Sequence, residues 1–233
     1  MKIIKCNNNH DIWIEFQDEY KIKVHTTYDI FLKGKVSNPY DKTIYGVGYI
    51  GEGNYSRTKS SDIYKKWHGM LKRCYDPYEL NRHPTYIDCT VCKEWLCLQN
   101  FGKWYEENYY KIEGEEMELD KDILFKGNKI YSPQTCIFVP HNINNLFVKN
   151  NSLRGDLPIG VSFHKRDKKF YAQCNITKKE KKWLGYFNTI EEEFLSYKIF
   201  KEKYIKEIAN KYKDLIPQKL YDAMCRYKVE IND

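Results

Sequence analysis

The sequence predicts an α+β protein made of three consecutive segments, covering residues 1–58, 59–150 and 151–233. Short runs in which apolar and polar residues alternate occur in the first and last segments, as expected for half-buried β-strands. The middle segment carries large apolar residues at helical spacing, followed by short strand-like runs. A hydrophobic content of 42% in 233 residues is enough to build packed cores.

The first segment is predicted to be a small β-rich module. Residues 11–16 and 20–24 each alternate between apolar and polar side chains. Four glycines fall within residues 45–53, but no helix with a Lys-Ser or Lys-Thr pair follows them. A tight turn is therefore favoured over a phosphate-binding loop.

The middle segment is predicted to contain two amphipathic helices before its short strands. Ser60 and Ser61 are suitable caps for the first helix. Its apolar stripe consists of Tyr64, Trp67, Met70, Leu71 and Cys74. The stripe of the second helix consists of Trp95, Leu98, Phe101, Trp104 and Tyr105. Both stripes are typical of core-facing helix surfaces rather than of ligand sites.

The last segment is predicted to be a three-stranded antiparallel sheet packed on one amphipathic helix. The strands cover residues 160–164, 170–176 and 183–187, and basic turns connect them. Thr189 is a suitable helix cap, and three glutamates follow it in the first turn, where negative charge complements the helix dipole. Residues 150–156 form a polar linker before this unit.

Positive charge is concentrated in this last sheet. Residues 161–187 contain eight Lys or Arg and two acidic residues, which gives eight minus two, or +6, of a whole-chain net charge of +7. Tyr171, Gln173 and Asn175 alternate on one face of the central strand, between two basic turns. Such a face suits a polyanion, with cations on phosphates and amides at base edges. The alternative is an ordinary solvated sheet surface.

Four pieces of this segment resemble, in order, the plant ethylene-response-factor type of DNA-binding domain. They are Gly160-Val161, residues 169–172, residues 184–187 and residues 189–192. The resemblance implies that the sheet, not the helix, enters the major groove of double-stranded DNA. The DNA-contacting candidates are Lys165, Arg166, Lys169, Tyr171, Gln173, Asn175, Lys182 and Trp183. That family carries mostly Arg on its sheet where this chain has Lys, which lacks the guanidinium fork for bidentate guanine contacts.

The middle segment resembles phage and mobile-element HNH endonucleases, which often carry a domain of the ethylene-response-factor type behind the nuclease. The matching pieces are Trp67, Arg73-Cys74-Tyr75, Cys92, Trp95, residues 119–121, Asn128, residues 131–133 and Cys136. The resemblance implies a β-β-α metal finger that cleaves DNA with one divalent ion, normally Mg²⁺. Asp120 and Asp122 are the candidate ligands for that ion, and Asn128 is the candidate for orienting the hairpin.

The motif differs from the family at the residue that acts as the general base. A His normally follows the Asp, but Lys121 stands there, and a protonated Lys is a poor general base. His141 is the nearest other imidazole in sequence, and a structural His is the alternative interpretation. Thr135 replaces the last Asn of the motif. An active nuclease and an inactive DNA-binding relic therefore both remain open.

Cysteine spacing suggests a second, structural metal. Cys89 and Cys92 form a Cys-x-x-Cys pair, and together with Cys74 and Cys136 they are candidates for a tetrahedral zinc site. Cys97 and His83 are alternative ligands if one of these four cysteines does not bind the metal. The alternative is buried thiols, since a single Cys-x-x-Cys pair is a weak signal.

Three functions follow from these features. The first is a site-specific DNA endonuclease targeted by its last segment, and the second is an inactive relic acting as a DNA-binding regulator or phage counter-defence factor. The third is an RNA-binding module, because exposed aromatic rings also stack on unpaired bases. Palindromic cutting would require a homodimer. Without a signal peptide or a run of ~18 apolar residues, we expect a cytoplasmic protein with no membrane partner.

Overall fold

The computed structural model describes residues 1–148, 157–176 and 180–233. It is an α+β structure with several small sheets, so the predicted fold class is confirmed at this level. The chain divides into two compact units. Unit 1 comprises Met1–Asn108 and Lys129–Pro133, and unit 2 comprises Tyr109–Asn128 and Gln134–Asp233. The predicted division into segments 1–58, 59–150 and 151–233 stays a prediction. The two units are defined by contacts within the chain, and such contacts do not show which parts fold independently.

The N-terminal part of unit 1 is a three-stranded antiparallel sheet. Its strands are β1 (Lys2–Asn8), β2 (Asp11–Glu15) and β3 (Lys23–Thr26), in the order β1-β2-β3. Ile12 and Ile14 of the central strand are fully buried. The short helix α1 (Tyr28–Leu32) follows, and the Thr27 hydroxyl caps it by accepting the Ile30 amide. Strand β1 was not predicted, because it lacks a regular apolar alternation.

The rest of unit 1 is mainly helical. Its elements are α2 (Ser61–Tyr75), α3 (Pro77–Arg82), the 3₁₀ turns η1 (Pro84–Tyr86) and η2 (Lys93–Leu96), α4 (Leu98–Asn108), and the parallel strands β4 (Thr90–Val91) and β6 (Ile130–Tyr131). Trp67, Trp95, Leu98 and Phe101 are almost completely buried. The Trp67 indole donates to the Trp95 carbonyl at 2.7 Å, which satisfies its polar group inside this core.

The predicted second helix of this region is interrupted. Trp95 lies in the 3₁₀ turn η2, Cys97 is extended, and α4 begins only at Leu98. Tyr49 forms an isolated parallel bridge with Cys97, and its carbonyl accepts the Leu98 amide at 3.0 Å. The apolar spacing continues across this break, so the pattern alone could not reveal it.

Unit 2 begins with a strand pair followed by a short helix. Strand β5 (Met117–Asp120) pairs antiparallel with β7 (Ile137–Pro140), and α5 (His141–Asn144) follows directly. Strand β6, which belongs to unit 1, falls between β5 and β7 in sequence, and the HNH-like arrangement expected from the resemblance stays a prediction.

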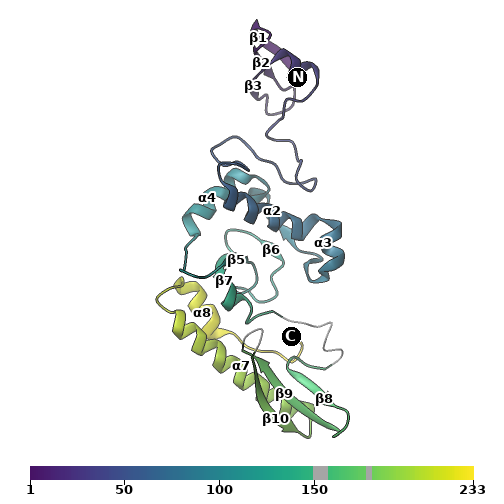
Figure 1. Ribbon diagram of the computed structural model, residues 1–233, viewed down its shortest axis with the longest axis vertical. Helices are drawn as coiled ribbons and strands as arrows, with labels where there is room; N and C mark the ends of the chain where they lie inside the picture. The colour runs from purple at the N-terminus through teal and green to yellow at the C-terminus, as the bar shows by residue number, and fades with distance from the viewer. Residues whose placement is uncertain (149–156, 177–179) are drawn as a thin grey trace. The chain divides into compact units, whose positions relative to one another are not determined.

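The last part of unit 2 is the predicted sheet on a helix (Figure 1). Strands β8 (Val161–His164), β9 (Lys169–Asn175) and β10 (Lys181–Phe187) form an antiparallel sheet in the order β10-β9-β8. Helix α7 (Ile190–Tyr212) packs on this sheet, and α8 (Gln218–Arg226) packs on α7. Thr189 caps α7 as predicted, by accepting the Glu192 amide at 3.2 Å.

Helix α7 contributes to two apolar cores. Tyr197, in its first half, packs with Ala172 and Cys174 of β9. Ile205 and Ala209, in its second half, belong to a core that also includes β7, α5 and α8. The two halves of one continuous helix therefore join the sheet to the β5–β7 strand pair.

Two predicted features lie outside the described residues. They are the whole linker at residues 150–156 and part of the second basic turn, at Lys178 and Lys179. Among the described helices, none is both long and apolar enough to cross a membrane.

Candidate functional site

Asp120, the predicted metal ligand, lies at the end of β5 and closes the turn after it. Its Oδ1 accepts hydrogen bonds from the amides of Asp122, at 2.9 Å, and Ile123, at 2.7 Å. Burial, with a smaller contribution from Asp122, raises the pKa of the Asp120 carboxyl to about 6. The first role of this carboxylate is thus to hold the local backbone.

The neighbouring candidates also bond within this turn. Lys121 is buried, and its Nζ lies 3.2 Å from Oδ2 of Asp122. Asn128 donates from Nδ2 to the Lys121 carbonyl at 2.7 Å, so it ties the two ends of the loop together. This bond agrees with the hairpin-orienting role expected of Asn128.

His141 pairs with a carboxylate that the sequence did not single out. Its Nδ1 lies 2.7 Å from Oε1 of Glu118, and Asn144 donates to the other oxygen of the same carboxylate. The imidazole is about one-third exposed, at 33%. A carboxylate on Nδ1 fixes the ring and leaves Nε2 for another partner. Glu118 precedes the quoted motif by one residue, and only the fold shows its role.

His141 and Asp120 lie at opposite ends of the strand pair. The His141 amide donates to the Glu116 carbonyl, whereas Asp120 pairs with Ile137 at the far end. The His141 ring itself reaches Glu118, which is two residues from Asp120 on the same face of β5, or about 7 Å along the strand. The structure therefore joins His141 to Glu118 rather than to Asp120.

The predicted zinc ligands do not form a metal-type cluster. Across the described ranges, no three His, Cys, Asp or Glu side chains form a group that could hold a metal ion. Cys74, Cys89 and Cys136 are buried, and burial raises the pKa of the Cys92 thiol to about 11. A raised thiol pKa disfavours the thiolate that zinc requires. Both the zinc and the magnesium sites stay predictions from spacing and resemblance.

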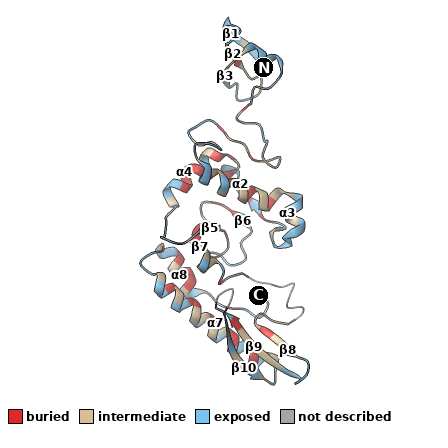
Figure 2. Ribbon diagram, viewed as in Figure 1, coloured by how far each residue is buried: buried red, intermediate tan, exposed pale blue. Residues whose placement is uncertain are grey.

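The outer face of the β8–β9–β10 sheet carries most of the predicted DNA-contacting residues. Buried Ala172 and Cys174 alternate along β9 with Tyr171, Gln173 and Asn175, so these three point away from the core. Figure 2 shows buried positions along this strand. Trp183 of β10 pairs with Gln173, and Lys169 at the start of β9 pairs with His164 of β8. Directly paired residues share a face of an antiparallel sheet, so Trp183, Lys169 and His164 belong to this outer face.

The register places Lys181, rather than Lys182, on the outer face. Lys181 pairs with Asn175, whereas Lys182 pairs with Cys174, whose side chain is buried. Both lysines are exposed, but they lie on opposite faces of the sheet. The sequence-based choice of Lys182 is thus replaced by its neighbour.

A β-bulge brings a further ring to the outer face. The register shifts between Trp183 and Gly185, and Gly185 has a φ of +128°, a region that favours glycine. Tyr186 consequently pairs with Tyr171 and shares its face. Uninterrupted alternation from Trp183 would have turned Tyr186 towards the helix.

Four rings now form one exposed cluster, which we call the ring cluster: His164, Tyr171, Trp183 and Tyr186. Tyr171 stacks on Trp183 with centroids 5.4 Å apart, and Trp183 meets Tyr186 edge-on at 5.0 Å. His164 contacts Tyr171 and Tyr186 at 6.3 and 6.2 Å. Trp183 and Tyr186 are each 49% exposed. The rings therefore pack against one another, and the exposed surfaces of Trp183 and Tyr186 remain accessible to a partner.

The turn between β8 and β9 places cations beside the ring cluster. Lys165 and Arg166 are exposed there. Arg166 Nε lies 2.9 Å from Oδ1 of Asp167, and His164 Nδ1 lies 3.1 Å from Oδ2 of the same carboxylate. Asp167 therefore lies beside both Arg166 and His164 at one end of the outer face, although its approach to His164 does not have hydrogen-bond geometry.

Comparisons of this chain with protein-family models, curated proteins and solved structures gave no match.

Proposed function

We propose that this protein binds double-stranded DNA through the outer face of the β8–β9–β10 sheet. The observation that carries the proposal is the ring cluster, which lies on the same face as Gln173, Asn175 and Lys181. Exposed aromatic rings that form one contiguous patch, rimmed by polar and charged side chains, are typical of an interaction surface.

Each kind of side chain on this face has a matching group in duplex DNA. Lysines neutralise phosphates and release condensed counterions. The amides of Gln173 and Asn175 can donate and accept at base edges, with adenine as the usual bidentate partner. Rings can pack against thymine methyl groups or sugars. A β-sheet fits the major groove, which is about 12 Å wide.

The lysine pair at positions 181 and 182 gives a matched test. We expect Lys181→Glu to weaken binding to duplex DNA by about tenfold and to lower the salt dependence of binding. Lys182→Glu makes the same charge change one residue away, on the opposite face, and should have a clearly smaller effect. Fluorescence anisotropy over a range of salt concentrations measures both quantities.

The outcome separates this proposal from its alternatives. Equal losses for the two variants would mean that only the net charge matters and that the outer face is not the binding surface. Tighter binding to single-stranded RNA than to duplex DNA in the same assay would favour the RNA-binding module instead.

A second candidate function is metal-dependent DNA cleavage at the β5–β7–α5 region. The observation that favours it is His141, which Glu118 orients directly after a β-β pair. A carboxylate-held imidazole is suited to accept a proton from water. The predicted pair Asp120 and Asp122 supports this function less well, because both carboxylates bond within their own turn.

A further inference from the structure

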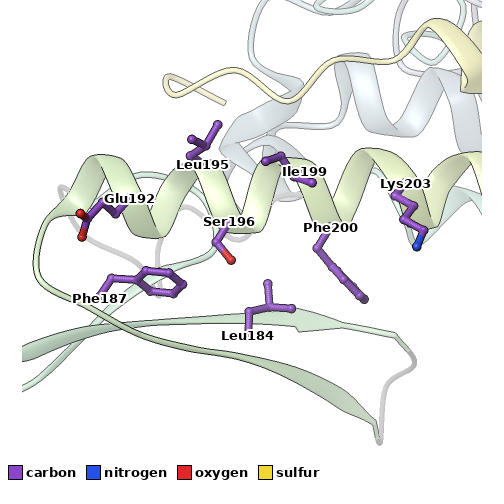
Figure 3. A pocket seen from close by; sticks show the side chains of 8 residues that line it. All are labelled: Leu184, Phe187, Glu192, Leu195, Ser196, Ile199, Phe200 and Lys203. Carbon is purple, nitrogen blue, oxygen red and sulfur yellow. The ribbon is translucent and has the colours of Figure 1, made fainter.

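Helix α7 and strand β10 enclose an open apolar groove on the side of the sheet opposite the ring cluster. Its volume is about 740 Å³, and its apolar lining comes from Leu184, Phe187, Leu195, Ile199 and Phe200 (Figure 3). Leu184 and Phe187 belong to β10, and the other three belong to α7. The groove therefore follows the helix axis along one edge of the sheet.

Two of the α7 residues that line this groove also form an apolar ridge along its outer rim. Leu195 and Ile199 are 54% and 61% exposed, and they lie one turn apart on the side of α7 that points away from the sheet in Figure 3. Single exposed leucines are common on protein surfaces. Two in register beside an apolar groove form a continuous patch, which is typical of an interaction surface.

Opposite charges mark the two ends of this surface. Glu192 lines one end of the groove and Lys203 the other, eleven residues along the same helix face. That spacing corresponds to about 16 Å of helix. The α7 positions that line the groove are symmetric about the midpoint between residues 197 and 198: 192 with 203, 195 with 200, and 196 with 199.

We propose that this surface binds a second copy of the same chain, with the two α7 helices antiparallel around a twofold axis. The axis would pass near the midpoint between Tyr197 and Lys198. Glu192 of each protomer then meets Lys203 of the other, and the ridge formed by Leu195 and Ile199 enters the partner's groove.

Self-complementarity is the reason for choosing a second copy over another partner. A twofold interface requires one surface to carry both halves of every contact. Here the same helix face supplies the ridge and the groove, and it supplies both the acid and the base. Ser196, the smallest lining residue, falls opposite Ile199 of the other protomer, where a small side chain leaves room for a branched one.

The first test replaces an exposed ridge residue in the full-length chain. We expect the wild-type protein to be a dimer in sedimentation equilibrium without DNA, and Ile199→Glu to raise the dimer dissociation constant by about tenfold or more. Ile199 is exposed, so the variant should fold normally, which circular dichroism checks. A wild-type chain that is monomeric up to its solubility limit would overturn the proposal.

The second test probes the antiparallel register by exchanging charges. Glu192→Lys and Lys203→Glu should each weaken the dimer through like-charge contacts, and the double variant Glu192→Lys/Lys203→Glu should restore it. Glu191→Lys is the control for the first change, because it lies in the same turn but outside the groove, and Glu192→Gln controls for the bond that the Glu192 carboxylate accepts from the Asn188 amide. Failure of the double variant to recover, or equal weakening by either control, would rule out this pairing.

These measurements do not depend on the DNA-binding proposal, because they follow the oligomeric state in the absence of nucleic acid. A dimer without DNA affinity, and a DNA-binding monomer, are both distinguishable outcomes. If both proposals hold, the twofold axis relates two outer sheet faces, and the preferred DNA site should contain an inverted repeat.

Discussion

In the β5–β7–α5 region the acidic side chains bond to the chain itself, whereas in the β8–β9–β10 sheet the polar and aromatic side chains face outward. Asp120 accepts two backbone amides, and Glu118 is held by His141 and Asn144. Trp183 and Tyr186, by contrast, are half exposed and contact mainly other rings. Residues whose bonds are already made stabilise a fold, and residues that remain open are the better candidates for a partner.

A catalytic role for the β5–β7–α5 region would contradict most directly this contrast between internally bonded and outward-facing side chains. Replacing His141 with Ala should reduce any cleavage that this region supports by about 10²–10⁴-fold, because the Glu118-held imidazole is its candidate base. Affinity for DNA should not change. A nicking assay on plasmid DNA with Mg²⁺ or Mn²⁺, together with anisotropy, measures both.

Asn142→Ala is the control for this variant, since Asn142 bonds to Glu115 rather than to Glu118. Cleavage that survives in His141→Ala but disappears in Asp120→Asn would restore Asp120 to the role predicted from the motif. Binding without cleavage by the wild-type chain over a range of metals would leave DNA binding as its activity.

A smaller effect is expected when the outer face of the β8–β9–β10 sheet is altered. The double variant Trp183→Ala/Tyr186→Ala removes half of the ring cluster and should weaken DNA binding by about tenfold, because two rings no longer bury apolar surface against thymine methyl groups or sugars. Unlike Lys181→Glu, it should leave the salt dependence unchanged, because no charge is removed.

Trp13→Ala offers a matched control for the ring cluster. Trp13 is also an exposed tryptophan on a strand, at 39%, but it lies in the N-terminal sheet of unit 1. Equal losses for Trp13→Ala and the double variant would show that exposed aromatic surface in general, rather than the outer face of this sheet, attracts the DNA.

The smallest expected effect concerns Glu193, a buried acid of α7 beneath the β8–β9–β10 sheet. Its Oε1 accepts the Ser162 amide of β8 at 3.0 Å, and burial raises the pKa of this carboxyl from 4.5 to about 7. The folded chain therefore keeps a proton that the unfolded chain has lost, so stability should fall as the pH rises between these two values. The difference between the two pKa values corresponds to a decline of at most about 3 kcal/mol.

Glu193→Gln should remove this part of the decline and stabilise the protein above pH 7. Urea denaturation at a series of pH values measures it, with exposed Glu191→Gln as the control. Asp120 has a raised pKa as well and adds a decline of the same sign to every variant, so only the difference between variants reports on Glu193. Parallel stability curves for Glu193→Gln and the wild type would contradict the expectation.

The strands of the last segment could be predicted because one pattern dominates each of them. Alternation in β9 places Ala172 and Cys174 inside, and Thr189 with its following glutamates marks the start of α7. These signals depend only on residues close in sequence. The N-terminal sheet was less predictable, because β1 has no such alternation.

The composition of the outer face could be predicted only in part, because it depends on pairing between strands. The bulge at Leu184 and Gly185 places Tyr186 outward, and the pairing of Lys181 with Asn175 decides which of the two neighbouring lysines lies on the outer face. A glycine inside a strand is a sign of a bulge, but its register is set by the partner strand. The Glu118–His141 pair is likewise created by the fold. The burial of Glu193 and Lys201 on α7 is also created by the fold, since charged residues are expected to be exposed.

Helix α7 has a consequence for how this part of the protein unfolds and how it can be divided. Since its two halves complete different cores, melting either core removes support from the other, and the β5–β7–α5 region and the sheet should lose structure in one cooperative transition. A cut at residue 150 would leave Ile205 and Ala209 without their apolar partners from β7 and α5. The smallest fragment that keeps the sheet on an intact helix therefore begins near residue 109, well before the sheet itself.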